Sequence, residues 1–157
     1  MVIKIICVGK IRSNEIKILI NSYLKKTNRF CSLEFVEIPD LKNSKNLSIN
    51  QIKLEESKLI FNKLKNNEII VALDENGEQL SSIDFSNFIE NKMITSTKTL
   101  VFILGGAYGL SKSLKDFSTF KISFSKMTFS HEIARLIAIE QIFRAITIIN
   151  NHPYHNK

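Results

Sequence analysis

A glycine-rich segment is the first candidate for chemistry in this sequence. Three of the five glycines in the 157-residue chain fall within residues 105–109, directly after an apolar run and before a helix-like segment. Such a turn lets backbone N–H groups approach a ligand closely, although a tight turn without a ligand has the same pattern. The spacing G-G-x-x-G differs from the dinucleotide signature G-x-G-x-x-G, and no acidic residue follows about 20 positions later, which disfavours NAD.

Charged and imidazole side chains mark the last helical pattern. His131 and Glu132 stand at its start, where a helix-capping segment is the alternative to a catalytic pair. Arg135 and Arg144 are two of only four arginines in the chain. Arg144 follows Glu140 by four residues, so a surface ion pair is the alternative to a functional role.

The C-terminal segment has an unusual composition for a chain end. His152, Tyr154 and His155 place two of the three histidines and a tyrosine in the last eight residues. Chain ends usually fray, so a disordered polar terminus is one interpretation. Imidazole and phenol groups are uncommon choices for such a terminus in a Lys- and Asn-rich protein, which favours a functional tail.

The composition describes one globular domain over residues 1–157. Apolar residues make up 44% of the chain and charged residues 24%, and a chain of this length buries roughly 68 to 70% of its unfolded surface. Disorder is therefore excluded. The longest apolar runs are far shorter than the ~20 residues of a membrane helix, and residues 1–9 lack a signal-peptide pattern, so we expect a cytoplasmic protein.

The two cysteines give no support for metal chemistry. Cys7 and Cys31 form no C-x-x-C pair and have no cluster of His or Cys beside them. We therefore expect two reduced thiols, at least one of them in the core, and no metal site.

The positive charge is concentrated in one part of the chain. The formal net charge is +7, and residues 1–66 carry 13 Lys and Arg against 6 Asp and Glu, whereas the remaining residues carry 9 of each. This surplus predicts a phosphate-contacting face. The excess of Ile, Lys and Asn is equally typical of a genome rich in A and T, which is the alternative explanation.

Strand-like and helix-like patterns alternate along the chain. A β-α order repeated through five units predicts an α/β domain with a mainly parallel sheet and helices on both faces. An acidic and polar run, residues 74–77, is expected to close the third strand. The strands are expected over residues 2–9, 33–38, 68–73, 99–104 and 121–124. The helices are expected over residues 13–26, 52–64, 82–91, 111–117 and 130–149.

The last helix is apolar on more than one side. On a helical wheel its alanines and most of its isoleucines share one side, but three isoleucines fall outside that side: Ile133, Ile137 and Ile148. A helix that is apolar nearly all round must be buried nearly all round. The same helix of a second copy is the simplest cover, which predicts a homodimer, while short N-terminal elements are the alternative cover.

Several segments together resemble one family over the whole chain. These are VIKIICVGK, FVEIPD, VALDENG, ILGGAYGLS, FSKMTFSHEIARLIAIEQIFRA and NHPYH, in this order. They resemble the bacterial RlmH family of SPOUT-class methyltransferases of large-subunit ribosomal RNA. The resemblance implies a C-terminal trefoil knot, a homodimer, S-adenosyl-L-methionine bound in the knot, and methyl transfer to N3 of a pseudouridine in the ribosome or its large subunit.

The resemblance also assigns residues to a site. The implied cofactor-binding positions are Leu73, Gly105, Gly106, Ser125, Lys126, Met127, Thr128, Phe129 and Ser130. The positions implied near the target base are His131, Arg135, Arg144, His152, Tyr154 and His155. A side chain at Gly106 is expected to fill space that the cofactor needs. His155 or His152 beside Tyr154 are the candidates for the base that removes the N3 proton, and the arginines would neutralise phosphate or the developing imide charge.

The chain departs from the family pattern at two places, and two other functions remain as alternatives. Ala107 and Tyr108 stand where many relatives have Pro-Glu or Ser-Asn, and Ser130 stands where proline is common. A non-catalytic ribosome-binding factor predicts a damaged glycine loop, which is not the case here. A SPOUT enzyme of transfer RNA would keep the cofactor and change the substrate. Because the surplus charge lies away in sequence from the glycine loop, we expect one subunit to present RNA to the pocket of the other.

Overall fold

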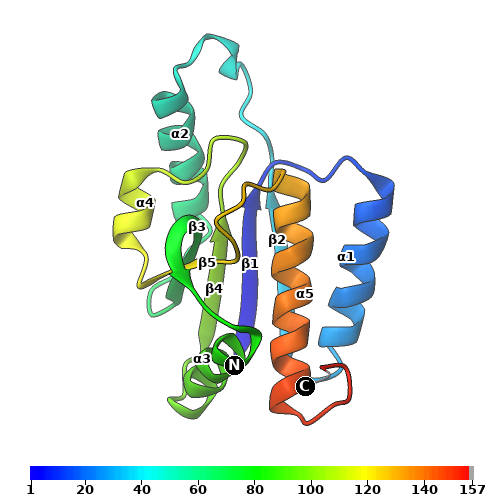
Figure 1. Cartoon of the computed structure of the whole chain (residues 1–157). Coiled ribbons are helices and arrows are strands. Elements are labelled where there is room, and N and C mark those ends of the chain that lie inside the picture. The colour runs from blue at the N-terminus through cyan, green and yellow to red at the C-terminus, as the bar shows by residue number, and fades with distance from the viewer. Residues whose placement is uncertain (156–157) are drawn as a thin grey trace.

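A computed structural model describes residues 1–155, and Figure 1 shows how its elements are arranged. Strands and α-helices alternate along this part of the chain, with one short 3-10 helix, η1, over Ser44–Asn46. The strands are β1 (Val2–Val8), β2 (Ser32–Ile38), β3 (Ile69–Gln79), β4 (Thr99–Leu104) and β5 (Phe120–Ser123). The α-helices are α1 (Asn14–Thr27), α2 (Ile49–Phe61), α3 (Ser82–Ile94), α4 (Lys112–Phe117) and α5 (His131–Ile149).

Serine residues fix the starts of four of these helices. In each case the hydroxyl oxygen accepts a hydrogen bond from a first-turn N–H that the helix itself leaves unpaired. The four capping residues are Ser13, Ser48, Ser81 and Ser111. Ser130 precedes α5, but its side chain makes no capping bond with any described residue. Glu132 in the first turn of α5 instead accepts a hydrogen bond from the backbone N–H of Arg12.

The strands form one sheet whose paired neighbours all run parallel. The strand order is β2-β1-β4-β3-β5. This confirms the α/β class with a parallel sheet that the alternating patterns predict. The carboxyl ends of the strands therefore lie at one edge, the place where open α/β sheets bind ligands.

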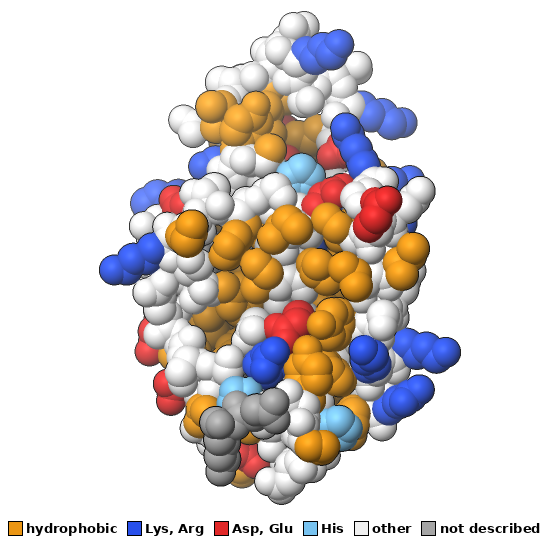
Figure 2. All heavy atoms as spheres, turned by 45° about the vertical axis from the view of Figure 1, so that its right-hand side comes forward, with side chains coloured by type: hydrophobic (Ala, Val, Ile, Leu, Met, Phe, Trp, Pro, Cys, Tyr) orange, Lys and Arg blue, Asp and Glu red, His pale blue; other side chains and the backbone are white. Residues whose placement is uncertain are grey.

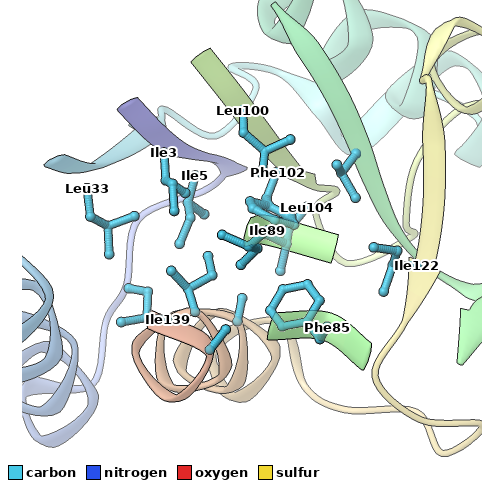
Figure 3. Close-up of a cluster of buried hydrophobic side chains, with 14 of the residues drawn as sticks. Ile3, Ile5, Leu33, Phe85, Ile89, Leu100, Phe102, Leu104, Ile122 and Ile139 are labelled. Carbon is cyan, nitrogen blue, oxygen red and sulfur yellow. The ribbon is translucent and has the colours of Figure 1, made fainter. Parts of the chain in front are cut away.

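Helices cover both faces of the sheet, as predicted. One buried cluster packs side chains of β1, β4 and β3 against α1, α3 and α5, and part of it is drawn in Figure 3. The opposite cluster packs the alternate strand residues against α2 and α4. Strand residues divide between the two faces by parity: Ile3, Ile5 and Phe102 face the first cluster, while Ile6 and Ile103 face the second. This division follows from the two-residue period of a strand.

The third strand is longer than the sequence predicts. Residues 74–77 were expected to close it, but β3 continues to Gln79. Its pairing with β5 shifts register between Leu73 and Glu78, so the polar run forms an irregularity within the strand instead of a terminal turn. Asp74 and Glu75 lie in this irregularity, at the carboxyl edge of the sheet.

Helix α5 runs alongside the sheet. It begins beside the carboxyl ends of the strands and ends near the opposite edge of the sheet (Figure 1). It packs against α1 and α3, and the middle of its predicted apolar side, including Ala138, Ile139 and Ile142, is fully buried, whereas Ala134 and Ile149 near its ends are partly exposed. Within residues 1–155, no helix is long and apolar enough to cross a membrane.

Candidate active site

A cavity of about 340 Å³ lies at the carboxyl edge of the sheet, between the irregular part of β3, the loops that follow β4 and β5, and the start of α5. Its walls include seven of the nine residues that the family resemblance implies for the cofactor. These are Leu73, Gly105, Gly106, Ser125, Met127, Thr128 and Phe129. Lys126 and Ser130 do not line this cavity, and Lys126 borders a neighbouring surface depression with Glu75.

The loop over residues 105–109 is tightly folded. A Cβ atom at Gly105 would lie 2.4 Å from the carbonyl carbon of Gly109 and 2.8 Å from the amide nitrogen of Leu110, so only glycine fits there. Gly109 has a φ of +76°, and its N–H donates to the carbonyl oxygen of Gly106 at 3.1 Å. The backbone of this loop can therefore approach a bound molecule without intervening side chains.

Gly106 lines the cavity and also lies directly against helix α2. A Cβ at this position would lie 2.6 Å from Oε1 and 3.0 Å from Oε2 of Glu56 in α2, so the carboxylate would have to move. The expectation that a side chain at Gly106 fills space that the cofactor needs stays a prediction.

A second loop, residues 123–129, forms another wall of the cavity. The Ser123 hydroxyl donates to the carbonyl oxygen of Ser125 at 2.9 Å, and the Met127 N–H donates to the hydroxyl oxygen of Ser125 at 2.9 Å. These bonds hold the loop in a turn. The side chain of Met127 is 74% exposed, so it forms an accessible apolar rim.

Charged groups around the cavity come from several elements. Lys115 of α4 pairs with Asp74 at 3.2 Å, and both line the cavity. Lys53 of α2 also lines it and makes no salt bridge within the part of the chain that the structure describes. Lys53 is far from the glycine loop in sequence, but packing of α2 brings this basic residue of the N-terminal part to the cavity of its own chain.

Of the residues expected near the target base, His131 and Arg135 lie at the start of α5. His131 is exposed and lines the cavity. Arg135 is fully buried and donates hydrogen bonds to the carbonyl oxygens of Val8 and Gly9, the latter at 3.0 Å. Its guanidinium therefore supports the end of β1, a placement that does not fit contact with a target base.

The other expected residues form a cluster at the far end of α5. Arg144 pairs with Glu140 at 2.6 Å, as the four-residue spacing predicts. The Tyr154 hydroxyl donates to Oε1 of Glu140 at 3.1 Å, and its ring centre lies 4.9 Å from the Arg144 guanidinium carbon. His155 Nδ1 lies 3.4 Å from Nη1 of Arg144. We call Glu140, Arg144, Tyr154 and His155 the tail cluster.

The tail is ordered by packing, and the structure through His155 does not support the frayed-end alternative. The Tyr154 ring packs on Phe143 with ring centres 4.7 Å apart, and its hydroxyl lies 3.3 Å from that of Tyr23 in α1. The ring of His152 meets Phe30 edge to face at 5.8 Å. Partial burial, the hydrogen bonds and the Glu140 charge raise the pKa of Tyr154 above its ordinary value, so its hydroxyl stays protonated.

The two groups of candidate residues do not meet within one chain. His131 and Arg144 are 13 positions apart on one continuous helix, which corresponds to about 20 Å along its axis. The cavity and the tail cluster therefore lie near opposite ends of α5.

Sequence patterns missed several residues of both places. Lys53, Asp74 and Lys115 line the cavity, and Tyr23 contacts the tail cluster. Asp74 stands within one of the segments that carry the family resemblance, so it could have been included. Nothing local in the sequence connects Lys53 or Tyr23 with these places, because packing alone brings their helices there. Among residues 1–155, no three His, Cys, Asp or Glu side chains are grouped as a metal site would need.

A family match and several curated relatives indicate the same kind of protein. The family described as "Predicted SPOUT methyltransferase" matches residues 1–155. A protein of Christiangramia forsetii named "Ribosomal RNA large subunit methyltransferase H" is 45% identical over 157 residues, which is 100% of both chains. Proteins with the same name are 49% identical in Phocaeicola vulgatus, over 88% of each chain, and 42% identical in Clostridium tetani, over 99% of each chain.

Solved structures support the fold. A probable methylase family protein from Haemophilus influenzae has a TM-score of 0.55 at 9% identity and is matched over 99% of this chain and 70% of its own. A probable methyltransferase from Bordetella pertussis has a TM-score of 0.55 at 10% identity, with 92% and 95% covered. The family match and the relatives that share 42% to 49% of their residues lead to one conclusion: this chain belongs to the SPOUT methyltransferase family.

Proposed function

We propose that this chain transfers the methyl group of S-adenosyl-L-methionine to N3 of a pseudouridine in large-subunit ribosomal RNA, within the ribosome or its large subunit. The observation that carries the proposal is the glycine-walled cavity at the carboxyl edge of the sheet. It occurs in a member of the SPOUT family whose relatives are named for methylation of this RNA. A ribosomal substrate implies that the protein acts in the cytoplasm.

The cavity has the chemistry that this cofactor requires. S-adenosylmethionine supplies a methyl group that its sulfonium makes electrophilic, so the protein must mainly position the two reactants. Apolar side chains such as Leu73, Ile122 and Phe129 can enclose an adenine ring, while the 105–109 backbone offers N–H and C=O groups. Lys53 and His131 at the same cavity are placed to meet a carboxylate or an RNA phosphate.

The tail cluster and the nearby His152 supply groups suited to the target base. The N3–H imide must lose its proton as the methyl group arrives, so an acceptor and a group that stabilises the anion are needed. Tyr154, with its raised pKa, is a donor and not a base. An Arg144 N–H facing Nδ1 of His155 leaves the proton of a neutral His155 on Nε2, where it can donate to a carbonyl of the base. His152 is then the candidate base.

A homodimer would bring these two places together. One stripe along α5 faces outward and comprises Ile133, Ile137, Glu140, Arg144 and Ile148, at the spacing of one helix face. The three isoleucines are at least partly exposed and belong to neither buried cluster. Figure 2 shows apolar side chains gathered over this side of the molecule, with charged groups among them.

A second copy covering this stripe makes the reaction site composite. If the two α5 helices pack antiparallel about a two-fold axis, the start of each lies beside the end of its partner. The tail cluster of one subunit then approaches the cavity of the other, which removes the separation of about 20 Å within a chain. Lys42, just before η1, and Lys45, within it, are both exposed and are proposed to contact RNA phosphates, so methyl transfer should weaken as salt increases.

Mixing two inactive variants tests the composite site. One variant carries Gly105→Ala, and the other lacks residues 154–157. After subunit exchange, a heterodimer with one intact cavity facing one intact tail should recover a sizeable fraction of parental methyl transfer. Proven heterodimers without recovery would show that each subunit uses its own tail. Mixing two preparations of the same variant is the control.

Mass spectrometry of ribosomal and transfer RNA tests the substrate. Cells lacking this protein should lose one N3-methylated pseudouridine from large-subunit RNA, and expression of the parent should restore it. Loss of a methylated base from transfer RNA instead would favour the alternative SPOUT function. No loss from any RNA would favour a non-catalytic ribosome-binding factor.

The trefoil knot, the single-domain organisation and the absence of a metal are part of the same proposal.

A further inference from the structure

Two consecutive residues of helix α2, Glu56 and Ser57, contact the 105–109 loop and the N-cap residue of α4 that follows it. Glu56 lies directly against Gly106, since a Cβ there would approach its carboxylate oxygens to 2.6 and 3.0 Å. A hydrogen bond from the Gly106 N–H favours the ionised form of this carboxylate. Next to it, the buried hydroxyls of Ser57 and Ser111 are hydrogen-bonded at 2.6 Å, while the Ser57 hydroxyl donates to the carbonyl oxygen of Lys53. Ser111 caps α4, so α2 contacts the loop at Gly106 and again where α4 begins.

The carboxylate of Glu56 is held in an unfavourable environment. Partial burial raises its pKa above the ordinary value, and the nearby charge of Asp40 acts in the same direction. The Gly106 hydrogen bond and the charge of Lys53 oppose that shift. A buried acidic group is retained against its desolvation only where its partners compensate, and here the described partners are the loop amide and the lysine that lines the cavity.

Glu56 contacts the loop without lining the cavity. Gly105 and Gly106 line the cavity, whereas Glu56, whose carboxylate lies against Gly106, is not among the residues that line it. Its effect on a molecule in the cavity is therefore indirect, through the position of the Gly106 peptide.

We propose that Glu56 is a positioning residue for the methyl-donor site, which fixes the Gly106 peptide from behind so that the 105–109 loop presents its backbone to the cofactor. The inference rests on the proposed binding of S-adenosylmethionine in this cavity. It also explains why position 106 requires glycine, since a side chain there would displace the carboxylate.

Calorimetry of S-adenosylmethionine binding to the full-length protein tests the role of Glu56. Glu56→Ala removes the acceptor and should weaken binding roughly ten-fold. Glu56→Gln keeps an oxygen acceptor and should stay within about three-fold of the parent. Glu55→Ala is the matched control, because Glu55 pairs with Lys58 on the exposed side of the same helix and should bind as the parent does.

Kinetics distinguishes positioning from a general loss of structure. Glu56→Ala should raise KM for S-adenosylmethionine while kcat at saturating cofactor and KM for ribosomes remain close to parental values. Parental affinity in Glu56→Ala would overturn the inference. A parent that binds no S-adenosylmethionine would instead refute the proposed function, so the two failures are distinguishable.

A double-mutant cycle keeps the test valid if Glu56→Ala also lowers stability. Gly106→Ala in the parent displaces the carboxylate and should weaken cofactor binding about as much as Glu56→Ala does, roughly ten-fold. In the Glu56→Ala background the added methyl group has space, so Gly106→Ala should cause a several-fold smaller loss than in the parent. Equal losses in both backgrounds would show that the contact between positions 56 and 106 does not control the loop.

Discussion

Replacing Arg135 by methionine should destabilise the protein and not selectively remove its activity. The Arg135 guanidinium is fully buried and donates to two carbonyl oxygens at the end of β1, those of Val8 and Gly9. Methionine fills part of the same volume but leaves both acceptors without this donor. Each charge-assisted bond contributes about 1.5 to 3 kcal/mol, partly offset because a buried guanidinium is itself unfavourable.

The expected net loss in the free energy of unfolding is about 2 to 4 kcal/mol. For a chain of this length, such a loss lowers the unfolding temperature by about 5 to 15 °C. Thermal unfolding followed by circular dichroism, at one fixed protein concentration, measures the change. Below the transition, Arg135→Met should retain most of its methyl transfer.

Arg144→Met provides the matched comparison for this prediction. Its side chain is 26% exposed and pairs with Glu140, so the loss in stability should be at most about 1 kcal/mol. Methyl transfer, in contrast, should fall severely because Arg144 belongs to the tail cluster. The reasoning is refuted if Arg135→Met unfolds at the parental temperature and loses methyl transfer alone, since Arg135 would then act at the target base.

Three further predictions follow from the cavity, the tail and the thiols. Gly105→Ala should weaken S-adenosylmethionine binding more than roughly ten-fold in calorimetry, because the added Cβ would lie 2.4 Å from the backbone of Gly109. A Cβ at Gly109 meets no atom within 4 Å, so Gly109→Ala should lose less affinity. The reverse order of affinities would contradict the loop geometry. Removing residues 154–157 should leave cofactor affinity within about three-fold but lower methyl transfer by roughly a hundred-fold or more, and unchanged transfer would exclude a catalytic tail. Burial raises the pKa of Cys31 from 9.0 to about 11, which lowers the fraction of thiolate at pH 8. The alkylation rate of Cys31 should therefore be roughly a hundred-fold lower in the folded protein than after denaturation. Equal rates in the two states would show that the thiol is not shielded.

The alternating sequence patterns predict most of the fold. Strand β4 has the predicted bounds, and the helices begin within a few residues of their expected positions because serine caps are local signals. The continuation of β3 past Leu73 was not predictable, since the run from Asp74 has the composition of a turn. Its pairing with β5 depends on a strand that lies about 40 residues later in the chain.

The candidate site was predictable only where its residues are close in sequence. The loops over 105–109 and 123–129 carry local signals, and the structure brings both to one cavity. Glu56 and Lys53 reach that cavity through packing of α2, for which no local pattern exists. The buried position of Arg135 did have a signal, because it precedes Ala138 and Ile139 by three and four residues on the core side of α5.

Methyl transfer by the purified protein is the most direct test of the proposed activity. Ribosomes isolated from cells that lack this protein would be incubated with it and with S-adenosylmethionine labelled in the methyl group, and Gly105→Ala would serve as the inactive control. We predict label in large-subunit RNA, located at N3 of a single pseudouridine, with little label from the control. Label that appears only in transfer RNA, or no label in any RNA while the cofactor binds, would contradict this account.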